Sequence, residues 1–386
     1  MRIIIGADLV PSKHNYDLFE KGNADDLVGV ELASILRKSD IRIFNLETVV
    51  GSKGQEIKKS GPYLRCPEKC FSGIAALNPT VLSIANNHVM DYGEDGLLET
   101  IRIIEDNGIE WVGAGINIDS LRKYTVIERN KIKVGVYSCA EHEFSIADSD
   151  CAGCNPYDPL YSFDDVHELS QKCDYLIVLY HGNKEYYRYP SPEVQRVCRK
   201  FAECGANMVL CQHSHCIGAA EEYRQCELVY GQGNFLFYGG EKDEFFQTGS
   251  LVQVDIDEKT KNCDVTYIPI VRNGVTIRLA SDSEKMKILE EFKHRSYQIK
   301  DTKFVEESYR EFASSMIETY YSRCLAKVRQ NFFFRVINKI GKGKILRYFF
   351  SDNECLAILN MLQCEAHREL FIEGLKGKIY GKTDKS

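Results

Sequence analysis

The stretch at 83–93, Ser-Ile-Ala-Asn-Asn-His-Val-Met-Asp-Tyr-Gly, constrains the possible folds of this chain more than any other. An apolar, partly β-branched run at 81–84 ends abruptly in two asparagines, His88 and Asp91, and a helical pattern begins at about residue 94. A short apolar run bounded by polar residues is typical of a buried strand. The pattern predicts a strand that carries polar side chains to the edge of a sheet, where an imidazole can bind metal or transfer a proton.

The chain up to residue 280 alternates between strand-like and helix-like segments, which predicts an α/β fold. Strands are expected at 2–5, 41–44, 81–84, 110–112, 174–180, 207–211, 227–230, 249–255 and 263–271. Helices are expected at 25–38, 67–77, 96–107 and 192–204. The segments 124–128 and 131–137 flank a polar turn and predict a hairpin.

Charge divides the chain into two parts. Residues 281–386 contain 20 Lys and Arg and 15 Asp and Glu, whereas residues 1–280 contain 29 and 41. This change predicts a boundary near residue 280 between a main domain and a C-terminal region. The first residues turn polar too soon for a signal peptide, and no stretch of 18 apolar residues occurs, so we expect a cytoplasmic protein.

Polar side chains follow the predicted strands repeatedly, at the edge where α/β sheets collect their binding residues. Candidate metal ligands at these positions are Asp8, Glu47, Asn87, His181, His213 and His215. A mixed nitrogen and oxygen set suits Mn, Fe or Zn, and such a set can hold two divalent ions. Each residue also has a structural alternative: a helix cap or turn for the carboxylates and asparagine, a hydrogen-bonded core-edge residue for His181, and a polar loop for the His-x-His pair.

Several motifs together resemble the CapA family of capsule biosynthesis proteins, which is named for poly-gamma-glutamate capsule synthesis. The matching motifs are Asn45-Leu46-Glu47, Ala85-Asn86-Asn87-His88 with Asp91-Tyr92-Gly93, Gly113-Ala114-Gly115, His181-Gly182 with Glu185-Tyr186, Gly205-Ala206-Asn207, His213-x-His215 and Gly233-Asn234-Phe235. They follow the family order over about residues 1–255. The family belongs to the calcineurin-like metallophosphoesterase superfamily, so the resemblance implies a two-sheet sandwich flanked by helices, with a dinuclear metal site at one rim.

The resemblance also implies a role for each matching residue. Asp8 and His215 would bind one metal, Asn87, His181 and His213 the other, and Glu47 would bridge them. His88 would be the leaving-group acid or transition-state stabiliser, and Asp91 would fix its tautomer. The chain departs from the superfamily in two places: the first motif is Asp8-Leu9-Val10, which lacks the histidine of Asp-x-His, and Glu47 replaces a shorter aspartate.

Further polar residues at the same strand ends are candidates for substrate contacts. They are Asn45, His142, Glu185, Tyr186 and Asn234. The alternative for His142 is an ordinary surface histidine. The expected substrate is an anionic polymer or a phosphoester.

The C-terminal region is expected to be helical. A capping box at Ser281 and Glu284 opens a helix to about residue 297, a second helix is expected at 304–330 and a last one from about 351 to 374. Residues 321–350 contain eight Lys and Arg and no Asp or Glu. This segment could rest on an anionic membrane surface or on a capsule-synthesis protein, or its helices could pack on the main domain with solvated lysines. Nucleic acid is not an expected partner, because the chain is acidic and carries no recognised binding motif.

Two functions remain open from the sequence. The first is a metal-dependent hydrolase that uses a metal-bound hydroxide on a phosphoester, or on an amide or ester bond, during capsule or exopolysaccharide synthesis. The second is a non-catalytic accessory protein of capsule polymer assembly that keeps the site for binding.

Overall fold

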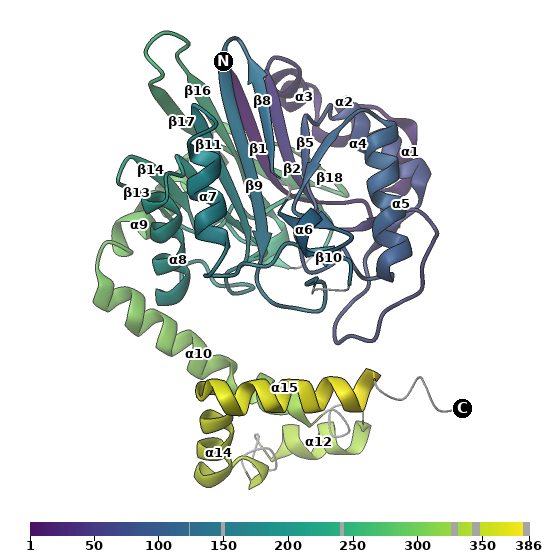
Figure 1. Ribbon diagram of the computed structural model, residues 1–386, viewed down its shortest axis with the longest axis vertical. Coiled ribbons are helices and arrows are strands. Elements are labelled where there is room, and N and C mark those ends of the chain that lie inside the picture. The colour runs from purple at the N-terminus through teal and green to yellow at the C-terminus, as the bar shows by residue number, and fades with distance from the viewer. Residues whose placement is uncertain (123, 148–150, 240–242, 326–330, 342–347, 381–386) are drawn as a thin grey trace. The chain divides into compact units, whose positions relative to one another are not determined.

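The computed structural model describes residues 1–386 except 123, 148–150, 240–242, 326–330, 342–347 and 381–386. The chain forms two compact units, Met1–Tyr309 and Arg310–Ser386. The first unit contains two large sheets with helices on their outer sides (Figure 1). This arrangement confirms the predicted two-sheet α/β sandwich with a C-terminal helical extension.

The first sheet has eight strands in the order β18-β17-β16-β1-β2-β5-β6, and β15 also pairs with β1. The strands are β1 (Arg2–Val10), β2 (Ile41–Leu46), β5 (Val81–Ser83), β6 (Glu110–Val112), β15 (Asn234–Phe237), β16 (Thr248–Ile256), β17 (Cys263–Asn273) and β18 (Thr276–Leu279). The neighbours β1, β2, β5 and β6 run parallel, so their carboxyl ends share one edge of the sheet.

The second sheet has six strands in the order β13-β14-β12-β11-β9-β8. The strands are β8 (Thr125–Arg129), β9 (Ile132–Ala140), β11 (Tyr175–His181), β12 (Met208–Gln212), β13 (Ala220–Tyr223) and β14 (Cys226–Val229). The predicted hairpin is present as the antiparallel pair β8 and β9. Two short pairs complete the strands of the described chain: β3 (Val49–Val50) with β4 (Arg65–Cys66), and β7 (Ala114–Gly115) with β10 (Gly153–Cys154).

Successive residues of the central strands enter different cores, because strand side chains alternate between faces. Ile3 and Ile5 of β1 belong to the core that also contains Ile177 and Leu179 of β11, between the sheets. Ile4 belongs instead to the core beneath the helices of the first sheet. Burial on both faces explains why these strands read as continuous apolar runs in the sequence.

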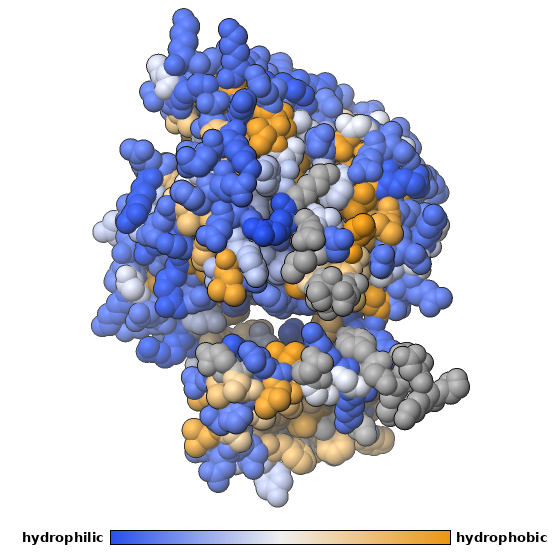
Figure 2. Space-filling model, in the orientation of Figure 1, coloured by the Kyte–Doolittle hydropathy of each residue, from blue (hydrophilic) through white to orange (hydrophobic). Residues whose placement is uncertain are grey.

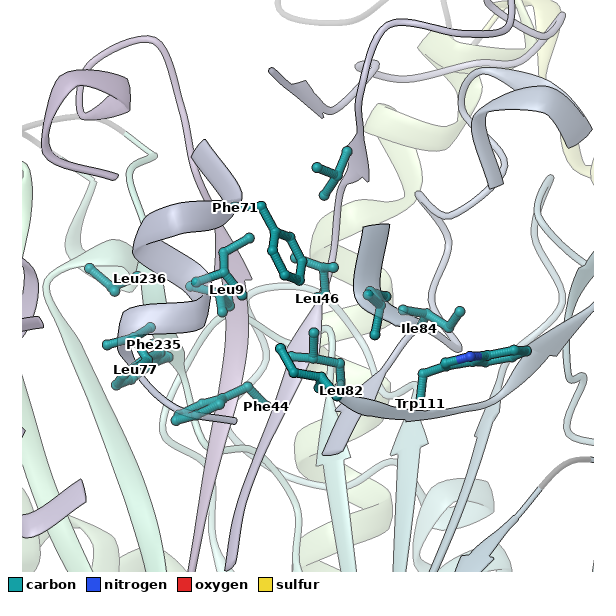
Figure 3. Packing of buried hydrophobic residues seen from close by; sticks show 14 of the residues in the cluster. Leu9, Phe44, Leu46, Phe71, Leu77, Leu82, Ile84, Trp111, Phe235 and Leu236 are labelled. Atoms are coloured by element: carbon teal, nitrogen blue, oxygen red, sulfur yellow. The ribbon is translucent and has the colours of Figure 1, made fainter. Parts of the chain in front are cut away.

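Helices cover the outer faces of both sheets. They are α1 (Tyr16–Lys21), α2 (Ala24–Val28), α3 (Val30–Arg37), α4 (Phe71–Ala76) and α5 (Gly93–Asp106) with the first sheet, α7 (Ser162–Ser170) and α8 (Pro192–Glu203) with the second, and the short α6 (Ile118–Leu121) beside β7. Figure 3 shows the core of the first sheet, where Phe44 stacks on Phe235 with ring centroids 4.8 Å apart. Gly6 allows this packing, because a Cβ there would lie 2.6 Å from the Phe44 ring.

Two elements differ from their predicted bounds for identifiable reasons. The single helix predicted at 25–38 is two helices, α2 and α3, because Gly29 between them has φ 77°. Strand β1 continues past Ile5 to Val10, because β15, which the sequence analysis missed, pairs with its second half in the register Asp8 to Asn234. The first difference comes from backbone conformation and the second from strand pairing, and neither can be read from the spacing of apolar residues.

Helix α9 (Asp282–Gln298) begins at the predicted capping box, where Glu284 accepts a hydrogen bond from the Ser281 backbone N–H at 2.8 Å. It packs on β13 and β17 of the first unit, and Phe292 joins the core between the sheets. The compact units therefore divide after residue 309, whereas the change in charge falls at residue 280, just after β18.

The elements that the structure describes in the second unit are helices. They are the C-terminal part of α10 (Thr302–Cys324), α12 (Phe332–Ile340), α14 (Asp352–Gln363) and α15 (Glu365–Tyr380). The end predicted for α10 at residue 330 lies outside the described residues. The helix predicted at 351–374 is two helices, because Cys364 between them has extended backbone angles. Among the described residues, no helix is long and apolar enough to cross a membrane.

Candidate metal centre

The candidate metal centre lies where the carboxyl ends of parallel strands from both sheets meet. Asp8 lies on β1, and Glu47 directly follows β2. From the second sheet come His181, the last residue of β11, and His213, which directly follows β12. Segments separated by more than 100 residues in the sequence therefore contribute to one buried cluster.

Glu47 is common to two groups of potential ligands. One group is Glu47, His181 and His213, and the other is Asp8, Glu47 and His215. Within each group the ligand atoms all lie within 4.8 Å of one another, and every residue is buried. The grouping matches the assignment implied by the family resemblance, in which Glu47 is shared.

Distances between the donor atoms fit a shared ion. Two atoms bound to one ion at about 2.1 Å, with an angle of about 90–110° between the bonds, are separated by about 3.0–3.4 Å. His181 Nε2 lies 3.0 Å from Asn87 Oδ1 and 3.4 Å from Glu47 Oε1. In the other group, His215 Nδ1 lies 3.5 Å from Asp8 Oδ2, slightly beyond this range.

Several potential ligand atoms in these groups are buried and have no hydrogen-bond partner. They are Asp8 Oδ2, both carboxylate oxygens of Glu47 and Nδ1 of His213. Leaving a buried polar atom unpaired costs about 1–3 kcal/mol, and more when the group is charged. Four such atoms in one cluster are consistent with a site for divalent metal, because bound cations would give each of these atoms a partner.

The charged groups of the cluster shift one another's pKa values. Burial opposes ionisation of Glu47, but His181 and His215 outweigh that effect and lower the pKa of the carboxyl to about 2. Burial would lower the pKa of His215, yet contact with Asp8 and the charge of Glu47 raise it to about 9. The pKa of His213 is lowered well below its usual value by burial and by the two other imidazoles, so this ring is neutral and has a free lone pair.

The His-x-His motif occupies a loop with unusual backbone angles. His213 has φ 79° and His215 has φ 54°, both in the left-handed region that costs a non-glycine residue about 1–2 kcal/mol. The strand ends at Gln212, and the two rings of the following loop have centroids 6.1 Å apart. Such strain is concentrated at functional sites, where the surrounding structure enforces it.

Asparagines hold the ligands in place. Asn45 donates a hydrogen bond to Asp8 Oδ1 at 2.8 Å, and its Nδ2 lies 3.2 Å from Nδ1 of His181. Asn234 Oδ1 lies 3.0 Å from His215 Nδ1. Asn45 and Asn234, predicted as substrate contacts, are buried among the ligands, where Asn45 holds the carboxylate of Asp8 and Asn234 lies beside the imidazole of His215.

His88 and Asp91 form a pair beside the metal groups. Nδ1 of His88 lies 2.7 Å from Asp91 Oδ2, an arrangement that leaves the ring's other nitrogen for a reacting molecule. Asp91 also accepts hydrogen bonds from the Leu64 backbone N–H at 2.7 Å and from the Lys59 ammonium. Lys59 is almost fully buried, so its positive charge acts directly on the carboxylate of Asp91.

The loop that carries Lys59 is anchored on α5. The backbone N–H groups of Ser52 and Lys53 both donate to Glu99 Oε2 at 2.6 Å. The sequence analysis missed Lys59, since the loop at 51–63 has neither a strand nor a helix pattern. Nothing in the local sequence distinguishes Lys59 from its neighbour Lys58.

Glu141, which directly follows β9, also reaches the centre. Its Oε1 lies 3.5 Å from His213 Nε2, on the opposite side of the ring from the unpaired Nδ1. A metal-binding histidine usually donates its other N–H to a carboxylate or carbonyl, which fixes the ring. Its neighbour His142, the residue selected from the sequence, is exposed.

We expect Glu141→Ala to lower metal affinity by about 10–100-fold, the usual effect of losing an outer partner of a ligand. Glu141→Gln should retain most of the affinity, because the amide oxygen keeps an acceptor beside Nε2 of His213. Titration calorimetry with Mn²⁺ or Zn²⁺ measures both values. Glu143→Ala, two residues away and exposed, is the matched control, and an equal loss in that variant would contradict a specific role for Glu141.

Two remaining substrate candidates lie at the outer side of the site. Tyr186 is exposed, and its ring centroid is 5.9 Å from that of His215 and 5.2 Å from that of Phe245. Glu185 is half-buried. Contact with the substrate stays a prediction for Tyr186 and Glu185.

Comparisons with known proteins agree with the family resemblance. The family described as "Bacterial capsule synthesis protein PGA_cap" matches residues 3–239. The chain is 25% identical over 287 residues to the PGA biosynthesis protein CapA of Bacillus subtilis, covering 73% of this chain and 74% of that protein. It is 24% identical over 242 residues to the capsule biosynthesis protein CapA of Bacillus anthracis, covering 60% and 59%. Among solved structures, a novel phosphatase from Mycoplasma pneumoniae aligns with a TM-score of 0.45 and 16% identity, covering 74% of this chain and 96% of that one.

Proposed function

Because the chain belongs to the bacterial capsule synthesis protein family PGA_cap, we propose that it is a metal-dependent hydrolase of capsule, exopolysaccharide or poly-gamma-glutamate synthesis. The single observation that carries this proposal is the pair of buried ligand groups that share Glu47, with four donor atoms lacking hydrogen bonds. A structural core histidine or carboxylate would instead be satisfied by protein groups.

We assign two divalent ions to the centre, with Mn, Fe and Zn as candidates. Asp8 and His215 would hold one, Asn87, His181 and His213 the other, and Glu47 both. When bound, such ions polarise a phosphoryl or carbonyl oxygen and lower the pKa of a coordinated water.

The chain's own residues would position the substrate and move a proton. His88 donates its Nδ1–H to Asp91, so its Nε2 is the atom that exchanges a proton with the leaving group. The carboxylate of Asp91, which accepts hydrogen bonds from Lys59 and from the Leu64 backbone, fixes the orientation of the His88 ring. Tyr186 and Glu185 would contact an anionic polymer or phosphoester at the outer side.

The proposal is tested by His213→Ala, with metal content and turnover on generic phosphodiester and phosphomonoester substrates measured together. We expect both to fall, because the variant removes a ligand of one group. His294→Ala, an exposed histidine on α9, should keep both. A variant at position 213 that hydrolyses these substrates as fast as the parent would contradict the enzyme assignment.

A second candidate function is supported by the position of Val10. The superfamily's first motif carries a histidine there, and here the position holds a buried valine. An accessory protein that binds metal or polymer without turnover fits such a reduced site. Bound metal in the parent protein, with no turnover across a broad panel of phosphoester, amide and ester substrates, would favour this function over the hydrolase.

A further inference from the structure

Helix α12 in the second unit exposes an unusual amount of apolar surface. Phe332, Phe333 and Ile340 are 65%, 74% and 77% exposed. No residue of this nine-residue helix is buried. Exposed apolar side chains clustered on one element mark a site of interaction, whereas single ones are common on any protein.

Five of the six apolar residues of α12 lie on one face. At 3.6 residues per turn these five fall within an arc of about 140°, whereas Phe334, which is 39% exposed, lies outside this arc. The members of this face are Phe332, Phe333, Val336, Ile337 and Ile340. Arg335, Asn338 and Lys339 project from the other side of the helix. The helix is therefore amphipathic, with a basic polar side and a broad apolar face.

Other helices of the unit also expose apolar side chains. Helices α14 and α15 pack on each other, yet Leu356 and Leu362 of α14 and Leu370 and Phe371 of α15 remain exposed. Figure 2 shows apolar residues gathered over the helices of this unit. The second unit thus exposes apolar side chains on at least three helices.

The charge of the surrounding chain indicates what would cover α12. Residues 321–350 contain eight Lys and Arg and no Asp or Glu, in a protein whose net charge is −7. An amphipathic helix with bulky apolar residues on one face and cations on the other fits a membrane interface, where the cations meet anionic headgroups. A protein partner would not require acidic residues to be absent throughout a segment of this length.

We propose that the second unit docks on an anionic lipid bilayer, with the apolar face of α12 in the interface and Arg335 and Lys339 of the same helix against the headgroups. The docking is independent of the hydrolase activity, because none of these residues belongs to the metal centre. It would hold the first unit at a membrane surface, where a polymer destined for the cell envelope is accessible.

The test is co-sedimentation of the full-length protein with vesicles made of an equal mixture of phosphatidylcholine and phosphatidylglycerol. The double variant Phe333→Ser/Ile340→Ser should bind at least about tenfold more weakly, because it removes apolar contact area. Arg335→Glu/Lys339→Glu should weaken binding similarly, and raising the salt to about 0.5 M should weaken binding of the parent. Vesicles of phosphatidylcholine alone should bind the parent poorly.

The matched control is Val30→Ser/Leu160→Ser, which removes two side chains of similar exposure, 66% and 73%, from the first unit. This control should bind the mixed vesicles as the parent does. Equal binding by the α12 variant and the parent, or no binding of the parent to mixed vesicles, would overturn the proposal. A parent that is dimeric by light scattering, with a monomeric α12 variant, would also overturn it by showing that this face joins two copies of the chain.

Discussion

Glu47→Gln is expected to lower metal affinity at both ligand groups by about 100-fold or more, since even outer partners of a ligand contribute 10–100-fold. Glu47 is the one residue common to both groups, and both of its oxygens lack protein partners. The glutamine keeps the size of the side chain but replaces one oxygen ligand by an NH₂ group and removes the charge. Metal analysis after dialysis should find neither ion retained, and turnover should be lost with them.

Single-group variants provide the contrast. His215→Ala should lose the ion of its own group and keep the other, because Asn87, His181 and His213 remain. Thermal unfolding gives a second measurement, since a ligand at 100 times its Kd stabilises the folded state by about 2.7 kcal/mol. EDTA should therefore lower the Tm of the parent and of the exposed control Glu290→Gln, but not that of Glu47→Gln. A Glu47→Gln protein that retains two ions would refute the shared position of this carboxylate.

His88→Ala is expected to lower kcat by about 10²–10⁴-fold, the usual contribution of a positioned acid or base, and to leave the metal content unchanged. The reason is geometric: His88 belongs to neither ligand group and is held instead by Asp91. Turnover and metal content should therefore separate in this variant, whereas in His213→Ala they fall together.

The leaving group supplies the sharpest test of that role. A substrate with a good leaving group, such as a nitrophenyl ester, needs little protonation, so it should lose less activity in His88→Ala than an alkyl ester does. Equal losses on both substrates would show that His88 acts by another means, such as binding the substrate anion. Loss of metal from His88→Ala would assign the residue to the ligand set.

Much of the fold could be predicted because local patterns and long-range packing agree. The apolar run at 81–84 forms β5, the hairpin at 124–137 forms β8 and β9, and the capping box at Ser281 opens α9. Where they disagree, the prediction failed. Gly29 breaks a helix that apolar spacing would continue, and β15 extends β1 through a pairing between residues more than 200 positions apart.

The candidate site divides in the same way. Strand ends carrying histidine, carboxylate or amide side chains are visible in the sequence, and the structure brings Asp8, Glu47, His181, His213 and His215 together. Glu141 and Lys59 were missed because their significance lies only in what they contact. Glu141 faces a histidine 72 positions later in the chain, and Lys59 reaches Asp91 from a loop without regular structure.

The sequence by itself determined the α/β architecture, the edge at which polar residues collect and the kind of ligands offered there, because these follow from side-chain periodicity and chemistry within short segments. Only the tertiary structure decided that the ligand atoms within each of the two groups lie within 4.8 Å of one another, that Asn45 holds Asp8, and that Lys59 and Glu141 lie against Asp91 and His213. The physical reason is that distances of about 3 Å between atoms on different strands depend on the register and packing of two sheets, which no local pattern encodes.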